Sequence, residues 1–556
     1  MKNIITLSFL SVVLFALFSL SVFKHISYPL LWQDESNTAM GAERVVQYGY
    51  PKVHDGKNIY NDMVMDTTIS VNKRDALVGA ANWGQYYFGV IGYKLAEQAD
   101  DLYVKTGLFR TPFAALGMIG LALWVFFMLR FCPGKFSKLL FAALFIFLSL
   151  LSVSLTIHLR EARYYSLLIF CASLVLGLYA AYRFHKPFNK IVFIGIEVAA
   201  LFVIFISYSP MYAALLLTLG LSELIIAVPV YRKSGFTKAF KYILPLIMLA
   251  AASLLSIWPM IIEFNYFEAM KAVDDGGVQI TWDVYKEHIA TIFGYFKNYG
   301  FLWLAVAMRM LVWCNSKKLK VQRTEVFKVS NFLTLFFIVT MFTVAWSPQM
   351  MYTRYFICLL PAMSIVMIFD AFMLRHCYST RKQKTVNYKV IVPGILFVVL
   401  FFSSFINILP QLKAHLYEMT HQYKGPLDYT IPYIKENFPR ADTLIIAANY
   451  EEYAYMYYLN SKVLIGFAGT NVAEEIKLTP DIIAYRKYWP RFHSVFNSYF
   501  QRAPYDPVMF PVFDGLVNNI PELNLMPSLT HKFKTVPTEN PQEATFLYIK
   551  LGQTPE

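Results

Sequence analysis

"IITLSFLSVVLFALFSLSVF", residues 4–23, is a run of twenty residues without a single charge. A helix needs about 20 such residues to cross the hydrocarbon core of a bilayer, so this run is predicted to span a membrane. It is not interpreted as a signal peptide, because no small-residue cleavage site of the A-x-A kind follows it. The next stretch, "LLWQDESNTAMGAERVVQYGYP" at residues 30–51, places the adjacent acids Asp34 and Glu35 where this span leaves the membrane.

Similar apolar runs recur along the whole chain. Hydrophobic residues make up 57% of the 556 residues and charged residues only 15%, a balance well beyond that of soluble domains. This composition predicts a polytopic α-helical membrane protein of about eleven spans. Beyond the first, the spans are expected near residues 107–129, 138–157, 165–183, 190–207, 210–230, 242–262, 298–314, 331–347, 355–374 and 389–410.

The net charge of +14 comes largely from short stretches between these runs, such as YRKSGFTKAFK and NSKKLKVQR. The positive-inside rule assigns these stretches to the cytoplasmic face. With the N-terminus inside, an odd number of spans places the C-terminal part on the exported, periplasmic side. Topology in a plasma (inner) membrane therefore explains the charge, and no interleaving of basic and aromatic residues indicates a nucleic-acid partner.

The sequence divides into two parts. Residues 1–410 are predicted to form a transmembrane module whose exported loops are residues 24–106 and 263–297. Residues 411–556 are predicted to form a small exported α/β domain. In this part, helix-like pieces (PLDYTIPYIKENF and EEYAYMYYLN) alternate with strand-like pieces (DTLIIAANY and KVLIGFAG).

Asp34 has two interpretations on its sequence alone. It precedes a helix-like segment that carries Ala39, Ala42 and Val45 on one side and ends at Gly49. An aspartate in that position typically caps the helix, because its carboxylate accepts hydrogen bonds from free backbone N–H groups. The alternative is a chemical role at the membrane surface, and the two are not exclusive.

Two short exported turns carry arginines. HLREARYYSL, residues 158–167, contains Arg160 and Arg163, and SPQMMYTRYFICLLP, residues 347–361, contains Arg354. Arginine is under-represented in short exported loops, so these turns go against the trend that the other loops follow. The side chains either anchor the chain at the membrane interface or bind an anion there, since a guanidinium matches a phosphate with two parallel hydrogen bonds.

Taken together, these features resemble the GT-C glycosyltransferases. The features are the Asp-Glu pair in the first exported loop, the REARYY turn, the RYxxxxLP entry to a late span and the exported C-terminal domain. Within that superfamily the chain resembles the branch of protein O-mannosyltransferases and aminoarabinose transferases, with its bacterial dolichyl-phosphate-mannose-protein mannosyltransferase-like members.

The resemblance implies an inverting transferase. It would move a hexose or pentose from a polyprenyl-phosphate donor to a lipid, protein or glycan acceptor on the exported face. Asp34 is then the candidate base that takes the proton of the acceptor, a role that typically contributes on the order of 10² to 10⁴ in rate. Arg160, Arg163 and Arg354 would stabilise the departing phosphate.

Supporting roles follow from the same resemblance. Glu35 is a candidate catalytic residue that holds the base or the acceptor, and Glu161 would orient an arginine or the sugar hydroxyls. Tyr164, Tyr355 and His54 are expected beside them. GT-C enzymes differ in whether a divalent cation assists, and the two adjacent acids, His54 and Asp55 offer donors for Mg²⁺ or Mn²⁺ without a diagnostic spacing, so no metal is assigned.

Two other classes of function stay open. A secondary transporter or lipid flippase would use the carboxylates predicted inside spans, Glu197, Glu223 and Asp370, whereas a transferase needs them only as structural groups. A membrane-anchored binding protein would place all activity in the domain after residue 411. The sequence identifies neither the sugar nor the acceptor.

Overall fold

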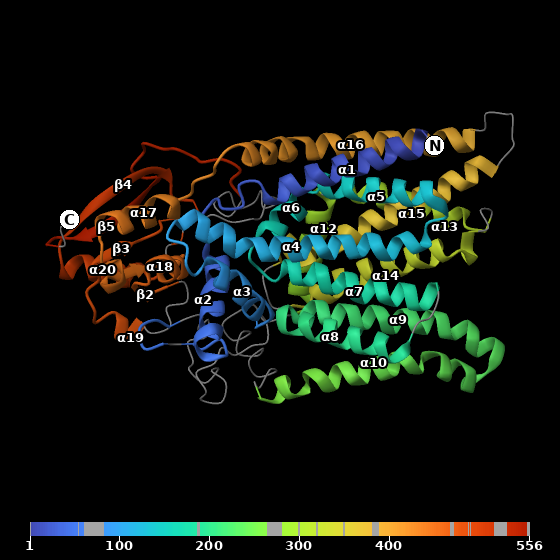
Figure 1. The fold of residues 1–556 in the computed structure, drawn as a ribbon, viewed down its shortest axis with the longest axis horizontal. Helices are drawn as coiled ribbons and strands as arrows, with labels where there is room; N and C mark the ends of the chain where they lie inside the picture. The colour runs from blue at the N-terminus through green and yellow to red at the C-terminus, as the bar shows by residue number, and fades with distance from the viewer. Residues whose placement is uncertain are drawn as a thin grey trace.

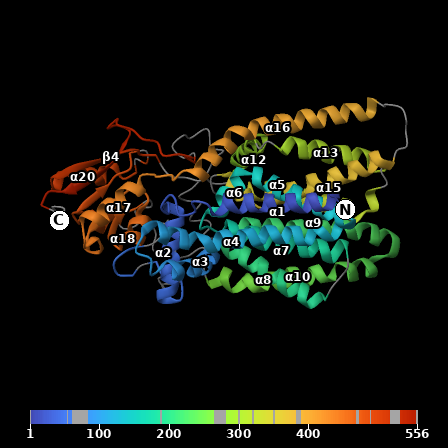
Figure 2. The ribbon, with the colours of Figure 1, turned by 45° about the horizontal axis from the view of Figure 1, so that its top comes forward.

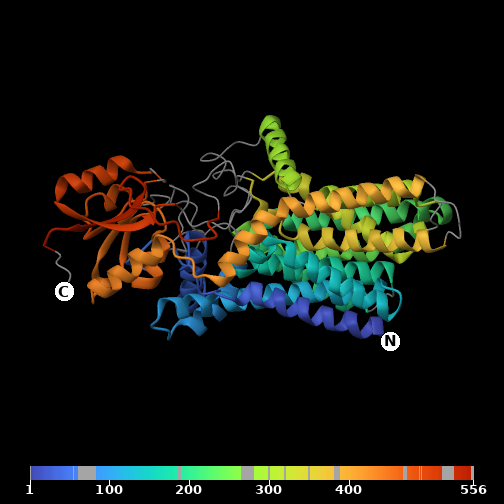
Figure 3. The ribbon, with the colours of Figure 1, turned by 90° about the horizontal axis from the view of Figure 1, so that it is seen from above.

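A bundle of long helices forms one part of the molecule, and a sheet domain lies beyond one end of it (Figure 1). The N-terminus lies at the far end of the bundle from the sheet domain, and a view from above shows the same arrangement (Figure 3). The computed structural model describes residues 2–53, 55–59, 83–185, 189–263, 281–298, 301–317, 321–347, 351–380, 388–466, 472–487, 489, 491–515 and 531–552.

A helix coincides with each of the eleven predicted spans. Eight helices in the described ranges are long and apolar enough to cross a membrane, and α13 is a shorter apolar helix. The predicted span 138–157 is divided at Ser152 into α5 and the short α6 (Val153–Arg160). The long helices are α1 (Lys2–Phe23), α4 (Leu102–Met128), α5 (Gly134–Leu151), α7 (Tyr165–Phe184), α8 (Lys190–Ser207), α9 (Ser209–Ser234), α10 (Phe236–Glu263), α13 (Leu302–Asn315), α14 (Glu325–Val344), α15 (Leu359–Thr380) and α16 (Tyr388–Thr420).

Helix α7 is the most buried of the candidate spans, with 78% of its apolar window inside the protein. It packs closely on α4 because glycines remove side chains from the contact. A Cβ added at Gly120 would lie 2.8 Å from backbone atoms of Phe170, which leaves no room for a larger residue. This close contact fixes the start of α7 and the turn that precedes it.

Helices α2 and α3 lie between the bundle and the sheet domain (Figure 2). Helix α2 runs across the end of the bundle, and Gly49 ends it in the left-handed conformation, with φ of 83° and its N–H bonded to Val45. The other short elements are α3 (Trp83–Ala96), η4 (Leu129–Phe131), α12 (Trp282–Asn298), η5 (Val321–Arg323) and η6 (Thr353–Phe356), and α2 spans Gln33–Tyr48.

The C-terminal part contains the predicted α/β domain. Its sheet has the order β2-β1-β3-β5-β4, in which β1, β2 and β3 are parallel and β5 and β4 are antiparallel to their neighbours. The four predicted pieces correspond to its first two helices and two strands. The elements are α17 (Leu427–Asn437), η7 (Ala441–Thr443), β1 (Ile445–Ala448), α18 (Glu452–Leu459), β2 (Lys462–Ile465), α19 (Val472–Glu475), β3 (Ile482–Ala484), α20 (His493–Arg502), β4 (Tyr505–Phe513) and β5 (Ala544–Lys550).

The sheet domain shares a hydrophobic core with the helices beside it. One cluster of buried side chains includes residues of α2, α3 and α4 together with residues of α17, α18 and the sheet. Phe109 of α4, for example, lies 6.0 Å from Tyr457 of α18 between ring centroids. Helix α16 continues past the predicted boundary to Thr420. The C-terminal part is therefore packed onto the first loop rather than tethered to the bundle by a linker.

Candidate functional site

Asp34 lies where three separate segments of the chain meet. Its Oδ2 is 3.4 Å from Nη2 of Arg163, in the turn before α7, and 3.4 Å from Nη1 of Arg354, in η6. Nη1 of Arg163 also donates to the backbone oxygen of Asp34, at 3.0 Å. The predicted convergence of an acid with arginines from distant loops is thus present.

The prediction of Asp34 as a helix N-cap is wrong. Helix α2 begins at Gln33, its cap residue is Trp32, and no side chain accepts a hydrogen bond at this cap. Asp34 therefore lies inside the first turn, where its charge still interacts favourably with the helix dipole. Its oxygens are free to face the two arginines because they are not used for capping.

Both arginines of this cluster are buried, each 8% exposed, whereas the side chain of Asp34 is a quarter exposed. The interpretation of Arg163 and Arg354 as interfacial anchors is therefore wrong, because their guanidinium groups turn into the protein. Nε of Arg163 and Nε of Arg354 make no hydrogen bond within the described ranges, and Nη1 of Arg354 has only its 3.4 Å ion-pair contact with Asp34. Buried donors without acceptors are costly, and an anion at this position would satisfy them.

Aromatic rings surround these arginines. Tyr164, Tyr208 and Tyr355 stack in a row, with centroid distances of 5.5 Å and 5.3 Å. The guanidinium of Arg354 lies 5.7 Å from the ring of Trp32, close enough for a cation–π interaction. The predicted supporting residues Tyr164 and Tyr355 thus lie at the site, and their rings restrict the positions that the guanidinium groups can take.

Glu35, adjacent to Asp34 in sequence, has a different environment. It is fully buried, and Arg110 of α4 holds both of its oxygens, with Nε at 2.7 Å from Oε1 and Nη2 at 2.5 Å from Oε2. The backbone N–H of Ala162 also donates to Oε1, at 2.9 Å. Glu35 therefore joins α2, α4 and the REARYY turn, and this geometry favours a positioning role over direct contact with a substrate.

Glu161 is hydrogen-bonded to Trp32, one of the aromatic residues beside Arg354. It accepts a hydrogen bond from the indole N–H of Trp32 at 2.9 Å, and its other oxygen lies 2.8 Å from Nδ1 of His158. Because Trp32 lies against Arg354, Glu161 acts on an arginine through the indole rather than by direct contact. The predicted orienting role is therefore consistent with this geometry, although the route is indirect.

Arg160 does not join the cluster around Asp34. Its Nη2 donates to the backbone oxygens of Lys24 at 3.1 Å and His25 at 2.9 Å. A further buried group nearby consists of Glu418 with His415 and His531, whose ring nitrogens lie 3.2 Å and 3.0 Å from its oxygens. The three arginines that were predicted to stabilise one phosphate therefore do not lie together. Arg163 and Arg354 lie at Asp34, and Arg160 lies at the end of α1.

The described residues considered as metal ligands are not arranged around a common position, and their carboxylates are paired with arginines. His54 lies outside the described residues. Asp55 is 2.5 Å from Nη1 of Arg44, and both adjacent acids are paired with arginines. Among the residues that the structure describes, no group of three His, Cys, Asp or Glu is arranged to hold a metal ion. No metal is therefore assigned, as in the sequence analysis.

Several residues at the site were not predicted. They are Trp32 and Tyr208 beside the arginines, Arg110 behind Glu35, and Glu452, which accepts a hydrogen bond from Gln33 at 2.8 Å. Arg110 left a signal in the sequence, since a charge within an apolar span marks a functional or paired site. The others are ordinary aromatic or acidic residues whose significance depends on contacts across the fold.

Two of the carboxylates predicted within spans have cationic partners. Glu223 pairs with Arg183, and Asp370 lies 2.9 Å from Nη1 of Arg309. Glu197 is fully buried without a hydrogen-bond partner in the described part of the chain. These three acids lie on different helices. The ion pairs of Glu223 and Asp370 agree with the interpretation of these acids as structural groups rather than as parts of a transport pathway.

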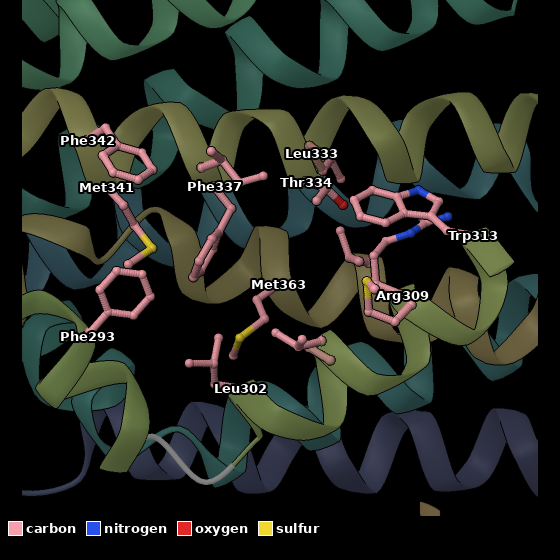
Figure 4. Close-up of a pocket in the computed structure, with 15 residues that line it drawn as sticks. Phe293, Leu302, Arg309, Trp313, Leu333, Thr334, Phe337, Met341, Phe342 and Met363 are labelled. Carbon is pink, nitrogen blue, oxygen red and sulfur yellow. The ribbon is translucent and has the colours of Figure 1, made fainter. Parts of the chain in front are cut away.

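An apolar cavity of about 260 Å³ lies among α12, α13, α14 and α15. Phe293, Leu302, Phe337 and Met363 surround it, and Arg309 with Trp313 lies toward its other end (Figure 4). Its lining is almost entirely hydrocarbon and aromatic. Such a cavity suits an aliphatic chain rather than a polar ligand.

No family model and no curated protein matches this chain. Solved structures do match it. ArnT from Cupriavidus metallidurans in the apo state aligns over 97% of both chains, with a TM-score of 0.50 and 12% identity. The chain therefore has an ArnT-like fold.

ArnT from the same organism bound to undecaprenyl phosphate aligns over 98% of both chains, with a TM-score of 0.53 and 12% identity. At this identity the likeness establishes the fold, and function has to be argued from the site. The predicted fold class, a polytopic helical protein with a small C-terminal sheet domain, is confirmed, and its fold is that of ArnT.

Proposed function

We propose that this protein is a polyprenyl-phosphate-dependent glycosyltransferase. The observation that carries the proposal is the position of Asp34 between two buried guanidinium groups, both 3.4 Å from its Oδ2. A carboxylate that is partly exposed can reach an acceptor, and fixed positive charge beside it can take up a phosphate. Both components of a sugar transfer from a phosphate carrier are thus in one place.

The reaction is a single displacement. The acceptor hydroxyl or amine attacks the anomeric carbon of the sugar while Asp34 takes its proton. The bond between that carbon and the phosphate oxygen breaks, and the electron pair leaves with the polyprenyl phosphate. Arg163 and Arg354 stabilise the negative charge that develops on this leaving group, and the anomeric configuration is inverted.

Binding of the donor also prepares the base. In the structure Arg163 and Arg354 are directed at the Asp34 carboxylate. A phosphate carries more charge than a carboxylate and matches the guanidinium fork better, so it competes for the same donors. Asp34 would then lose its ion pairs as the donor binds and become available for the acceptor proton.

The apolar cavity supports a lipid-linked donor. Met363 and Val366, which line it, belong to α15, the helix that follows η6 and Arg354. A prenyl chain that extends from a phosphate at Arg354 could follow α15 into this cavity. The ArnT structure with undecaprenyl phosphate is a solved example of this fold with such a lipid.

The finer points of the proposal rest on the sequence. The short basic loops favour a cytoplasmic N-terminus, with the site and the C-terminal domain on the exported side of an inner membrane. Whether a hexose or a pentose is moved, and to a lipid, a protein or a glycan, depends on a pocket that only a bound donor would define.

The test is a deletion strain complemented with variants of the full-length protein. Mass analysis of its polyprenyl phosphates is expected to reveal accumulated sugar-loaded carrier, which the wild type clears. Asp34→Asn should accumulate the carrier as the deletion does while reaching the membrane in normal amount. Glu43→Gln, an acid on the same helix outside the cluster, is the matched control and should clear it. If Asp34→Asn clears the sugar-loaded carrier at the wild-type rate, Asp34 is not the base of the reaction.

A further inference from the structure

The segment that leads into Asp34 is held by the C-terminal domain. The backbone N–H of Leu30 donates to Oδ1 of Asp428 at 3.0 Å, and that of Leu31 donates to the Tyr458 hydroxyl at 3.0 Å. All four of these residues are buried. Since an unpaired buried N–H is costly, the first loop depends on these acceptors for its conformation.

A third hydrogen bond lies directly beside the candidate base. Nε2 of Gln33 donates to Oε1 of Glu452 at 2.8 Å, and both side chains are buried. Gln33 precedes Asp34 and is the first residue of α2, so this bond fixes the start of the helix that carries the base. Glu452 is the first residue of α18.

The three acceptors are themselves held in place. The other oxygen of Asp428 accepts from the N–H of Gly425 at 2.7 Å, and the Tyr458 hydroxyl lies 2.5 Å from the Thr106 hydroxyl. Glu452 packs against Gly466, where an added Cβ would lie 3.0 Å from its Cγ. Gly466 also has a φ of 66°, which a residue with a side chain adopts only with strain.

The C-terminal domain also approaches the base itself. Burial raises the pKa of Tyr450 well above its usual value, and the negative charges of Glu451 and Asp34 raise it further. Trp32, the residue between Leu31 and Gln33, packs against Tyr423 and carries the indole beside Arg354. A shift of this segment would therefore move the base and the aromatic support of the phosphate-binding arginine together.

We infer that the C-terminal domain is a positioning element of the transfer site, acting through Asp428, Glu452 and Tyr458 on residues 30–33. The inference rests on the proposed function and deepens it. The three side chains are positioning residues, because each accepts a hydrogen bond from the segment that carries the base. A misplacement of about 1 Å in such a site can lower the rate about 10²-fold without loss of binding groups.

The experiment compares Glu452→Ala with Glu452→Gln in the full-length protein. Transfer is measured with sugar-loaded carrier extracted from the deletion strain, and binding with undecaprenyl phosphate alone. Glu452→Ala should lower kcat by about 10²-fold while undecaprenyl phosphate binds as tightly as to the wild type. Glu452→Gln keeps an oxygen that accepts from Gln33 and should restore most of kcat. Glu474→Ala, an exposed acid of the same domain paired with Lys477, is the control.

Hydrogen exchange of residues 30–38 provides a second measurement that does not depend on transfer. Glu452→Ala should speed exchange there, and Glu452→Gln and Glu474→Ala should not. Unchanged kcat together with unchanged exchange in Glu452→Ala would overturn the inference. If the wild type transfers no sugar at all, the proposed function fails, and the exchange rates alone then decide whether the domain positions the segment.

Discussion

Arg110 donates two hydrogen bonds to the carboxylate of Glu35, at 2.7 Å and 2.5 Å, and both side chains are buried. Asp34, the residue before Glu35, faces two other arginines at 3.4 Å and is a quarter exposed. Adjacent acids thus have opposite environments, because successive residues of a helix point about 100° apart. The difference predicts that their substitutions fail in different ways.

Replacement of Glu35 by Ala is expected to destabilise the protein by about 3–5 kcal/mol, because it leaves the Arg110 charge buried without a partner. The measurement is thermal unfolding of the purified protein in detergent. The double variant Glu35→Met with Arg110→Met removes both charges and should recover much of that loss. If Glu35→Ala unfolds like the wild type yet transfers no sugar, Glu35 is a catalytic residue and the positioning role is wrong.

Replacement of Arg354 by Met should lower kcat by about 10²–10³-fold, the usual effect of removing one donor that stabilises developing charge. Arg354→Lys keeps the charge but loses the planar fork and the stacking on Trp32, so it should recover only part of the rate. The measurement is kcat and KM for the loaded carrier. Arg160→Met is the comparison, since Arg160 lies apart from Asp34. An equal loss in kcat from Arg160→Met would mean that the site extends to the end of α1.

Filling the apolar cavity should reduce the preference for long lipid carriers. Ala305 lines the cavity, and Ala305→Trp would occupy much of its 260 Å³. We expect the affinity for undecaprenyl phosphate to fall by about tenfold or more, equivalent to 1.4 kcal/mol or more of lost apolar contact. The affinity for a short prenyl phosphate should stay unchanged.

Ile225→Trp is the control for this substitution, because Ile225 is an exposed residue of α9 outside the cavity. Equal losses for the long and the short carrier in Ala305→Trp would indicate a general disturbance of the bundle. An unchanged affinity for both would show that the lipid follows another path.

The buried group of Glu418, His415 and His531 should stabilise the protein less at acidic pH. Burial lowers the pKa of His415, which lies beyond the predicted end of its span, so the folded state disfavours its protonated form. Burial alone would raise the pKa of Glu418, but the charge of His531 and hydrogen bonds from both histidines hold it well below its usual range. A group whose pKa is lower in the folded state than in the unfolded state stabilises the fold fully above its unfolded-state pKa. This stabilisation is lost as the pH falls below that value. The unfolded-state pKa is about 6.5 for His415 and 4.5 for Glu418.

The unfolding temperature should therefore fall by a few degrees between pH 7.5 and pH 5.5, where only His415 of these two groups contributes, and further below pH 4.5. His415→Gln can still donate to Glu418 but does not titrate, so its unfolding temperature should change less over the first interval. Parallel pH curves for the two proteins would contradict this assignment.

Much of the fold could be predicted from the sequence, because a bilayer demands long apolar helices and these are visible as runs such as residues 4–23. The site was predicted in part for a related reason. Arg163 and Arg354 were identified because charged residues in short exported turns break a strong compositional trend. Their meeting with Asp34 followed from their common position at one end of the spans.

The remainder depended on packing that no local pattern encodes. The separation of Arg160 from the cluster reflects backbone acceptors at the end of α1. Asp34 resembles an N-cap in sequence, and only the start of α2 at Gln33 excludes it. The bond between Gln33 and Glu452 joins residues 419 positions apart, a distance at which periodicity carries no information.

This long separation has a consequence for biosynthesis. Asp34 emerges from the ribosome well before the acceptors that hold its segment, which are made roughly 400 residues later, and at about 5–20 residues per second this takes about 20–80 s. Throughout that interval the nascent chain has its base and arginines without the parts that align them. A newly made protein would therefore stay inert toward the carrier lipid until its sheet domain docks.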